Sequence, residues 1–362
     1  MRIGIDAREI VGRTTGVGRY LSGLLTEWAA TGAASRHEFL LYTHTPPASM
    51  PPHFDTRVLP GTSGTWWQQV TLPSAARADK LDVFFAPQYT APVLLNMPTV
   101  VVIYDVSFAA HPEWFRTLEG VRLRSLSRIA ARNARSVITI SEFSRREIAE
   151  HLRVPESRIK VIRPGVPIRE PALPQPGSRD SRLLYVGSIF NRRHVLDLIR
   201  AFAPVARRHP DASLDIVGDN RSYPFEDVVA AIDREQFGSR IRWHQYVTDE
   251  HLIGLYSRAR GFAFLSEYEG LGLTPLEALA AGVPPVLYDT PIARESCGES
   301  ALYAPVGDLD AVSSALERIL FDDAARAAIA GSARDTLARY DWRRAAQNTL
   351  EVVTSAARRT SG

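Results

Sequence analysis

The chain has 362 residues, of which 45% are hydrophobic and 23% charged, the proportions of an ordinary globular protein. At about 150 residues per domain, this length predicts two domains. The formal net charge of +3 is too small to indicate a nucleic-acid partner. A single cysteine, Cys297, excludes an intrachain disulfide and a metal site made only of cysteines.

No segment approaches the ~20 consecutive apolar residues that a membrane-spanning helix needs. Residues 1–6 are typical of a strand that begins at once, whereas a signal peptide would have a longer apolar stretch and a small-residue cleavage site. Together with the single cysteine, these features predict a cytoplasmic protein.

The first half of the sequence alternates short apolar runs with segments of helical periodicity. It predicts strands at residues 2–6, 38–43, 82–86, 99–103, 137–140 and 159–162. It predicts helices at residues 18–30, 66–78, 113–134 and 143–152. This alternation is typical of a parallel sheet with crossover helices.

A run of prolines interrupts the alternation at residues 164–178, which we interpret as an extended linker. Further strands are predicted at residues 183–187, 214–218, 241–244, 262–266, 285–288 and 301–304. Further helices are predicted at residues 195–208, 225–236, 249–259, 274–281, 308–320 and 342–357. Two doubly wound domains would therefore span residues 1–168 and 178–341. In such sheets ligands bind at the carboxyl ends of the strands, so the cleft between the domains is the expected site.

A glycine turn, Gly16-Val17-Gly18, follows the first strand and precedes a helix. Such a turn lets the backbone approach phosphate or sugar oxygens at a helix N-terminus, although it could equally be a flexible connection alone. It is not a dinucleotide fingerprint, because Leu21 occupies the place of the third glycine and no acidic residue ends the strand at 38–43. These two absences argue against an NAD-dependent oxidoreductase.

Two adjacent cations, Arg192 and Arg193, lie in the segment from Gly187 to His194 that follows a predicted strand. At the carboxyl edge of a sheet such a pair can neutralise a diphosphate, and arginine does so with two parallel hydrogen bonds. The alternative is a pair of solvated surface charges.

Residues 267–277 follow the strand predicted at 262–266 and lead into a helix, with Thr274 as the expected N-cap and Pro275 in the first turn. Glycine amides before a helix suit an anion, and ionised carboxylates accept sugar or ribose hydroxyls. Glu277, expected in the first turn, could instead only favour the helix dipole. The residues that predict binding here are Glu269, Gly270, Gly272 and Glu277.

In the first domain, Asp105 ends an apolar strand, where its carboxylate would face the cleft. His111 precedes a helix-starting proline and is more typical of a capping or packing residue. Trp66 and Trp67 could line an acceptor side, where aromatic faces stack on sugars, or could pack in the core.

Taken in this order, these segments resemble the retaining family-4 glycosyltransferases of the GT-B fold over nearly the whole chain. Residues 269–277 are similar to the Glu-x7-Glu motif of that family. The other similar segments are residues 16–20, 141–144, 161–166, 186–194 and 275–284. The resemblance implies two Rossmann-like domains that face a cleft, with the C-terminal helical segment, residues 342–362, crossing back onto the first domain.

The resemblance also implies roles for individual residues. Arg192 and Arg193 would bind the donor diphosphate and stabilise the leaving charge, Glu277 would hold the ribose, and Glu269 the transferred sugar. Asp105 would orient the acceptor or the sugar. The implied catalytic residues are Arg192, Arg193, Glu269 and Asp105. The implied donor-binding residues are Gly16, Gly18, Gly187, Arg192, Arg193, Glu269, Gly270, Leu271, Gly272, Leu273 and Glu277. The acceptor side would include Tyr104, Asp105, His111, Trp66 and Trp67.

Two positions depart from the family. Tyr104 stands where the family often has a histidine before the aspartate, so it must replace that histidine or the site must work without it. Arg193 replaces the usual lysine, which keeps the charge and changes its geometry.

The implied function is retaining transfer of a hexose from a nucleotide-diphosphate sugar, with GDP-mannose or a related sugar favoured. The acceptor would be a glycan or a lipid-linked glycan in bacterial polysaccharide, lipopolysaccharide or glycolipid assembly. No metal or other cofactor is expected, since no Asp-x-Asp segment stands out as a metal site. Two alternatives remain, a nucleotide-sugar 2-epimerase on the same fold and a non-catalytic nucleotide-sugar-binding protein.

Residues 115–135 form a basic amphipathic segment, either a solvated helix that covers the sheet or a surface that meets anionic lipid. The second interpretation predicts a protein peripheral to the inner face of the plasma membrane. The basic residues at helical spacing are Arg124, Arg128, Arg132 and Arg135. The apolar residues are Leu118, Val121, Leu126 and Ile129.

Overall fold

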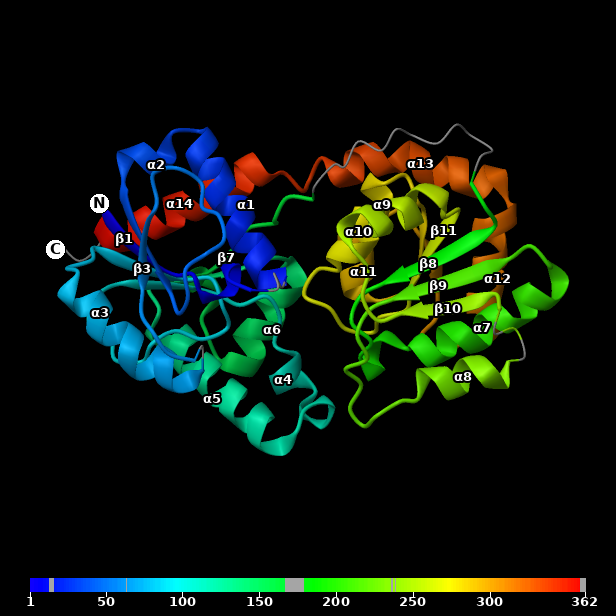
Figure 1. Cartoon of the computed structure of the whole chain (residues 1–362), viewed down its shortest axis with the longest axis horizontal. Helices are drawn as coiled ribbons and strands as arrows, with labels where there is room; N and C mark the ends of the chain where they lie inside the picture. Colours follow the sequence, from blue (N-terminus) through cyan, green and yellow to red (C-terminus); the bar gives the residue numbers. More distant parts are fainter. Residues whose placement is uncertain (13–15, 63, 167–178, 236, 238, 359–362) are drawn as a thin grey trace. The chain divides into compact units, whose positions relative to one another are not determined.

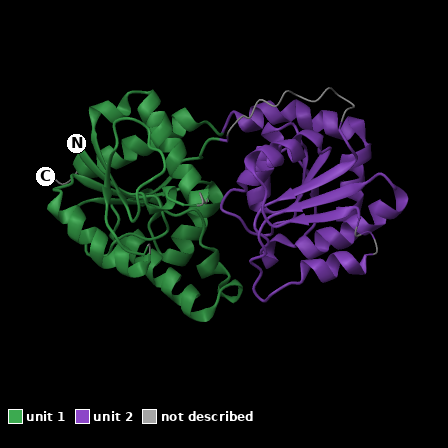
Figure 2. Cartoon of the chain, in the orientation of Figure 1, with its two compact units in different colours: residues 1–165, 340–362 green, residues 166–339 purple. Residues whose placement is uncertain are grey.

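The structure of the protein, a computed structural model, describes residues 1–12, 16–62, 64–166, 179–235, 237 and 239–358. The chain forms two compact units, unit 1 with Met1–Gly165 and Tyr340–Gly362, and unit 2 with Val166–Arg339 (Figure 2). Most of the predicted linker, residues 167–178, lies outside the described residues, and so do residues 359–362 of the C-terminal segment. Among the described residues, no helix combines the length and apolarity that a bilayer span requires.

Unit 1 is built on a parallel seven-stranded sheet with the order β3-β2-β1-β4-β5-β6-β7. Consecutive valines and phenylalanines, such as those of β4 and β5, are buried on both faces of the sheet, as central parallel strands require. The strand order reverses between β1 and β4, and ligands bind at such a switch point. The strands are β1 (Arg2–Asp6), β2 (Glu38–Thr43), β3 (Asp55–Val58), β4 (Val83–Ala86), β5 (Thr99–Val102), β6 (Ser136–Thr139) and β7 (Ile159–Val161).

Helices cover both faces of the unit 1 sheet (Figure 1). The C-terminal helix packs against the first one, and the indole of Trp28 donates a hydrogen bond of 2.9 Å to the carbonyl of Ala346. A side chain at Gly23 would collide with the ring of Trp342, so glycine is required there. The described helices are α1 (Gly16–Ala30), α2 (Ala33–Arg36), α3 (Leu72–Ala78), α4 (Ser107–Ala110), α5 (Thr117–Asn133), α6 (Glu142–Leu152) and α14 (Trp342–Arg358). Shorter helical turns are η1 (Arg8–Ile10), η2 (Trp67–Thr71), η3 (Pro112–Trp114) and η4 (Glu156–Arg158).

Unit 2 has a parallel six-stranded sheet with the order β10-β9-β8-β11-β12-β13, so its switch point lies between β8 and β11. Helices again cover both faces, and α7 packs against α8 and α12 (Figure 1). The strands are β8 (Arg182–Val186), β9 (Ser213–Val217), β10 (Ile241–His244), β11 (Gly261–Phe264), β12 (Pro285–Tyr288) and β13 (Leu302–Ala304). The helices are η5 (Asn191–Arg193), α7 (Val195–Arg208), α8 (Val228–Arg234), α9 (Asp249–Arg258), α10 (Leu273–Ala280), α11 (Pro291–Cys297), α12 (Leu309–Phe321) and α13 (Asp323–Leu337).

The structure adds elements that the sequence pattern did not predict, namely β3, α2, α4, α11 and α13. The edge strand β3 has largely exposed residues and no apolar alternation, and α13 is rich in alanine with a weak apolar face. The helix predicted at residues 225–236 begins only at Val228, because Asp227 caps it, and residue 236 lies outside the described residues. The helix predicted at residues 113–134 is divided into η3 and α5.

Candidate active site

Two segments predicted to bind a donor meet at the carboxyl edge of the unit 2 sheet. The strands β8 and β11 are hydrogen-bonded neighbours, with Leu184 opposite Phe262, so the segments that follow them emerge side by side. The amide of Glu267 donates a hydrogen bond of 3.0 Å to the carbonyl of Arg192. This contact joins η5 directly to the donor loop, by which we mean residues 265–272.

Arg193 and Glu269 form the central ion pair of this edge. Arg193 Nε donates to Glu269 Oε1 at 2.7 Å, and the two side chains are only 15% and 16% exposed. Arg193 Nη1 also donates to the carbonyl of Ser188 at 2.9 Å, while Ser266 Oγ donates to the same Glu269 oxygen at 3.0 Å. The guanidinium and the carboxylate are therefore both held in fixed orientations.

The charges of this pair stabilise each other. Burial alone would raise the pKa of Glu269, but Arg193 and Arg192 outweigh burial and hold that pKa below its ordinary value. Burial alone would lower the pKa of Arg193, and Glu269 reverses that effect and raises it. Both groups are thus ionised near neutral pH. An ionised carboxylate can accept sugar hydroxyls, and an oriented guanidinium can bind phosphate oxygens.

Aromatic faces surround the two arginines, and the sequence analysis did not predict this feature. The guanidinium carbon of Arg193 lies 4.9 Å from the ring centre of Phe264, and that of Arg192 lies 4.4 Å from the ring centre of Phe190. Tyr185 stacks on Phe264 with ring centres 5.7 Å apart. Cation–π contacts of this kind hold the cations where water is partly excluded. Phe190 lies within the arginine segment, and its position could have signalled such a contact.

Glycines shape both segments at this edge. Gly187 has φ +149°, and a Cβ there would lie 3.0 Å from Arg193 Nη1, so glycine permits the close approach of the guanidinium. Gly270 and Leu271 are buried, and Leu273 is the first residue of α10.

The start of α10 differs from the sequence prediction. The N-cap is Gly272, with the left-handed φ of +81°, and Thr274 is not the cap. The helix therefore begins one residue earlier than its predicted cap, which places Pro275 at its third residue and Glu277 beyond its first turn. The predicted position of Glu277 in the first turn was wrong, and the helix-dipole alternative loses its basis with it, while the binding role of Glu277 stays a prediction.

In unit 1, Asp105 follows β5 and is bound by its own surroundings. It accepts hydrogen bonds from the amide of Ser107 at 2.9 Å, from Ser107 Oγ at 2.6 Å and from the hydroxyl of Tyr89 at 2.9 Å. These bonds orient the carboxylate and fix the start of α4. The predicted role of Asp105 in orienting the acceptor or the sugar stays a prediction.

Tyr104 is partly buried and is held as a neutral phenol. Its hydroxyl donates to the carbonyl of Pro87 at 2.8 Å, and its ring meets Tyr20 and Tyr89 edge to face with ring centres 5.5 Å and 5.6 Å away. Burial, and then the neighbouring tyrosines, raise its pKa well above the ordinary value. It therefore cannot exchange a proton near neutral pH in the way a histidine would.

The other unit 1 predictions fall in different environments. Gly16 and Gly18 belong to the first turns of α1 and do not form a separate turn before it; residues 13–15 lie outside the described residues. Trp66 is 75% exposed, whereas Trp67 is 2% exposed and its indole donates to the carbonyl of Leu59 at 2.8 Å, which is the packing alternative. His111 stacks on a neighbouring tryptophan, as a packing residue does.

A buried ion pair at the end of β1 was not predicted. Asp6 is fully buried, Arg8 is 7% exposed, and Arg8 Nη2 donates to Asp6 Oδ2 at 2.9 Å. The guanidinium of Arg8 lies 5.6 Å from the ring centre of Trp67. The signal in the sequence was the pair of opposite charges two residues apart, Asp6 as the last residue of the first strand and Arg8 just after it.

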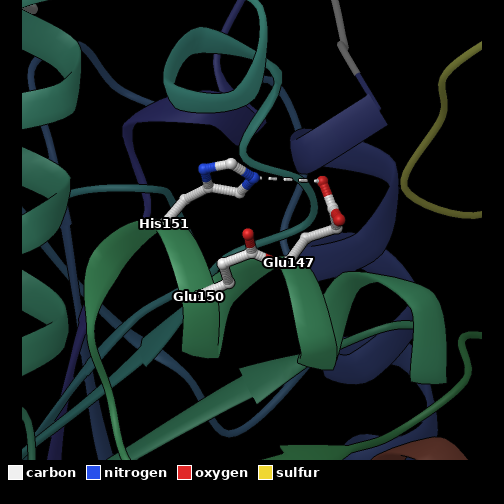
Figure 3. Close-up of side chains that lie close together, drawn as sticks. All are labelled: Glu147, Glu150 and His151. Carbon is white, nitrogen blue, oxygen red and sulfur yellow. Dashed lines mark ion pairs between the residues drawn. The ribbon is translucent and has the colours of Figure 1, made fainter.

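Within the described residues, one group of side chains has the ligand spacing of a metal site. Glu147, Glu150 and His151 lie on one helix, α6, with ligand atoms within 4.8 Å of one another, and Figure 3 shows Glu147 and His151 pointing toward each other. Glu150 is exposed, as solvated acidic groups commonly are. The spacing Asp308-Leu309-Asp310, which the sequence analysis passed over, lies at the start of α12, where Asp308 caps the helix. Metal independence stays a prediction.

Two family models match the chain, glycosyltransferase family 4 over residues 14–170 and glycosyl transferases group 1 over residues 172–336. With two parallel-sheet units of the Rossmann type, the matches define a glycosyltransferase of the GT-B fold. The chain belongs to the GT-B glycosyltransferases, its first half to family 4, and the predicted fold and family are confirmed.

Similar proteins of known activity are bacterial glycosyltransferases. O-antigen chain mannosyltransferase B of Escherichia coli is 27% identical over 77% of this chain and 75% of its own length. A glycogen synthase of Mycobacterium tuberculosis is 29% identical over 73% of this chain and 64% of its own length. GDP-mannose:cellobiosyl-diphosphopolyprenol alpha-mannosyltransferase of Xanthomonas oryzae is 25% identical over 73% of this chain and 69% of its own length.

Solved structures support the fold over the whole chain. Sucrose-phosphate synthase from Thermosynechococcus elongatus is similar with a TM-score of 0.78 and 18% identity, covering 98% of each chain. The Anabaena protein HepE in complex with UDP and glucose is similar with a TM-score of 0.73 and 19% identity, covering 98% of this chain and 99% of that one.

Proposed function

We propose that the protein is a retaining glycosyltransferase that moves a hexose from a nucleotide-diphosphate sugar to a glycan or lipid-linked acceptor without a metal ion. The observation that carries the proposal is the largely buried, oriented pair of Arg193 and Glu269 beside Arg192 at the carboxyl ends of β8 and β11. The pair supplies both chemical needs of a sugar donor, positive charge for the phosphates and a fixed acceptor for hydroxyls.

In the proposed reaction, the bond between the sugar's anomeric carbon and the diphosphate oxygen breaks, and a bond to the acceptor oxygen forms on the same face of the sugar. The proton of the acceptor hydroxyl passes to the departing nucleoside diphosphate. Arg192 and Arg193 stabilise the charge that develops on the leaving diphosphate, which is the largest contribution such a site can make. Their fixed charges take the place that a metal ion has in other phosphate sites. Glu269 and the amides of residues 270–273 hold the sugar, and Glu277 holds the ribose.

GDP-mannose or a related sugar is the proposed donor. The support is the similarity to the E. coli O-antigen mannosyltransferase and to the Xanthomonas enzyme whose name specifies GDP-mannose. The same relatives support a place in bacterial polysaccharide, lipopolysaccharide or glycolipid assembly. Asp105 of unit 1 would orient the acceptor or the sugar.

A membrane-facing surface on α5 is also part of the proposal, with the protein in the cytoplasm and peripheral to the inner leaflet. Leu118 is 86% exposed and Val121 47% exposed at the start of α5, which suits contact with lipid, and Arg132 near its end and Arg135 after it are exposed as well. Arg128 does not belong to this surface in the way predicted, because its guanidinium donates to the carbonyl of His151 at 2.9 Å.

The test of the donor is thermal unfolding of the protein with GDP-mannose, GDP, UDP-glucose and UDP, with no metal added. A ligand at about 100 times its Kd stabilises the folded state by about 2.7 kcal/mol. We expect the largest shift with GDP-mannose, and then mannose release or transfer in the presence of an acceptor glycan. A larger shift with UDP-glucose would overturn the donor assignment, and no shift with any of the four would overturn the proposed function.

A further inference from the structure

His194 occupies a position in the structure that its neighbours make chemically unusual. It follows the two arginines, adopts the left-handed φ of +47°, and is the N-cap residue of α7. Its Nδ1 lies 3.0 Å from Asp197 Oδ2, and its Nε2 lies 3.5 Å from Glu267 Oε2. The ring is 24% exposed and packs edge to face on Tyr288, with ring centres 5.3 Å apart.

Both ring nitrogens of His194 therefore face carboxylates. A neutral imidazole has one N–H and can face only one of them with it, whereas the imidazolium presents an N–H and positive charge to both, as a hydrogen bond with Asp197 and an ion pair with Glu267. The protonated ring thus links the first turn of α7, through Asp197, to the donor loop, through Glu267. Asparagine adopts a left-handed backbone more readily than histidine does. A contact with Asp197 alone or with Glu267 alone does not explain why histidine occupies this position.

Three consecutive residues hold the donor loop. The carbonyl of Arg192 accepts from the amide of Glu267, Arg193 pairs with Glu269, and His194 pairs with the side chain of Glu267. These contacts are not equivalent once a donor binds. A diphosphate on Arg193 competes with Glu269 for the same guanidinium, so the loop loses part of that support when it must present Glu269 to the sugar.

We propose that His194, as the imidazolium, is a positioning residue that keeps the donor loop in place through Glu267 while Arg193 engages the donor diphosphate. The proposal rests on the proposed function, because it takes the diphosphate as the ligand of Arg193. His194 itself touches no donor atom in this proposal.

The protonation that the proposal needs is favoured by the surroundings. The hydrogen bond with Asp197 and the ion pair with Glu267 raise the pKa of His194 to about 9, against the opposing effect of burial. The other groups near the ring are Glu226, Arg200 beside Asp197, and the hydroxyl of Tyr288, whose pKa burial raises to about 12. Because the folded pKa lies above the ordinary 6.5, the link is complete below pH 6.5 and is lost as pH rises through about 9.

The test compares His194→Asn with a matched control on the same helix. Asparagine tolerates the left-handed backbone and cannot carry the charge. The control is His209→Asn at the other end of α7, which removes a comparable pair, His209 Nε2 to Glu317 Oε1 at 2.7 Å, and does not contact the donor loop. Glu267→Gln removes the other partner of the link.

Two readouts are measured from pH 6 to pH 9.5. The first is the donor Kd and KM with GDP-mannose, and the second is hydrogen exchange of the donor-loop amides in the free protein, corrected for intrinsic rates. At pH 7 we expect His194→Asn to raise donor KM and loop exchange by about tenfold, with kcat changed far less, the scale of one lost interaction between charged groups. Above pH 9 the donor KM and loop exchange of the wild type should approach those of His194→Asn. In His194→Asn both quantities should stay constant with pH, and in His209→Asn both should match the wild type.

Other outcomes would separate the two proposals. Glu267→Gln should add no more than about twofold to the effect of His194→Asn, because both remove one link. Wild-type affinity and exchange in His194→Asn at pH 7 would overturn the positioning role while leaving the proposed function intact. If the wild type bound no nucleotide sugar, the donor assignment would fail. Loop exchange in the free protein that is the same in His194→Asn and the wild type would then overturn the link to Glu267 as well.

Discussion

The carboxyl edges of the two sheets hold their polar side chains in different ways. In unit 2, charged side chains from separate segments pair across the switch point, Arg193 with Glu269 and His194 with Glu267. In unit 1, Asp105 is bound by the neutral groups Ser107 and Tyr89, and the charged pair at the end of β1, Asp6 with Arg8, joins residues two positions apart. The comparison teaches that one topology can pair charges from separate segments at its carboxyl edge, as in unit 2. It can also keep a charged pair local to one strand end and surround a carboxylate with neutral donors, as in unit 1.

The difference has a chemical consequence. Oriented charges of both signs are suited to a ligand that has phosphates and hydroxyls together, since each partner can exchange its protein contact for a ligand contact. A carboxylate whose donors are a backbone amide and two hydroxyls keeps its own position and accepts little rearrangement. We therefore place donor chemistry on unit 2 and orientation on unit 1, and the following variants test that division.

The largest effect is expected from Arg192→Ala combined with Arg193→Ala. Loss of both cations removes the groups proposed to stabilise the leaving diphosphate, and kcat/KM should fall by about 10³-fold or more, or ~4 kcal/mol. The measurement is donor turnover per folded molecule, with the folded fraction followed by thermal unfolding, since Glu269 loses both cations that offset its burial.

The matched control for this variant is Arg182→Ala. Arg182 also pairs with a buried carboxylate of unit 2, Asp215, but near the amino end of β8. It should lower the free energy of unfolding and leave turnover per folded molecule within about twofold. Equal losses of turnover in the two variants would show that unit 2 responds to any lost buried pair, and the site assignment would fail.

An intermediate effect is expected from Asp105→Asn in unit 1. The amide nitrogen cannot accept, so one of the bonds from Ser107 or Tyr89 is lost and the start of α4 is loosened. We expect about a tenfold loss of transfer to the acceptor, with a much smaller change in donor Kd, because the proposed role concerns orientation. Calorimetry of donor binding beside acceptor-dependent turnover separates the two. A matching loss of donor affinity would contradict the division between the units.

The sequence predicted most of the strands and helices of the two units, but not the side-chain contacts at their carboxyl edges. Buried strands such as the one that contains Val100 to Val102, and the helices between strands, were predictable because each depends on the hydrophobic pattern of neighbouring residues. The pairing of Arg193 with Glu269 joins residues 76 positions apart, and only the adjacency of β8 and β11 brings them together. Resemblance indicated both residues as binding groups without indicating that they bind each other.

One error and one alternative left open at single residues have local physical causes. Thr274 is a good N-cap by composition, but Gly272 supplies the left-handed backbone that turns the chain into α10, so the helix begins earlier. The sequence does not show which of the two adjacent tryptophans is buried. The helical turn η2 directs Trp67 to the core, while Trp66 stays exposed. In both cases the deciding factor was a backbone direction that the residue types alone do not specify.

The smallest effect is expected from Tyr104→Phe. The change removes one hydrogen bond, from the hydroxyl to the carbonyl of Pro87, and keeps the ring contacts with Tyr20 and Tyr89. It should cost about 1 kcal/mol of unfolding free energy and leave kcat/KM within about twofold at every pH from 6 to 9, since a phenol of raised pKa does not titrate there. A titration of activity present in the wild type and absent in the variant would instead assign Tyr104 the proton-handling part of the histidine it replaces, and unit 1 would then carry chemistry as well as orientation.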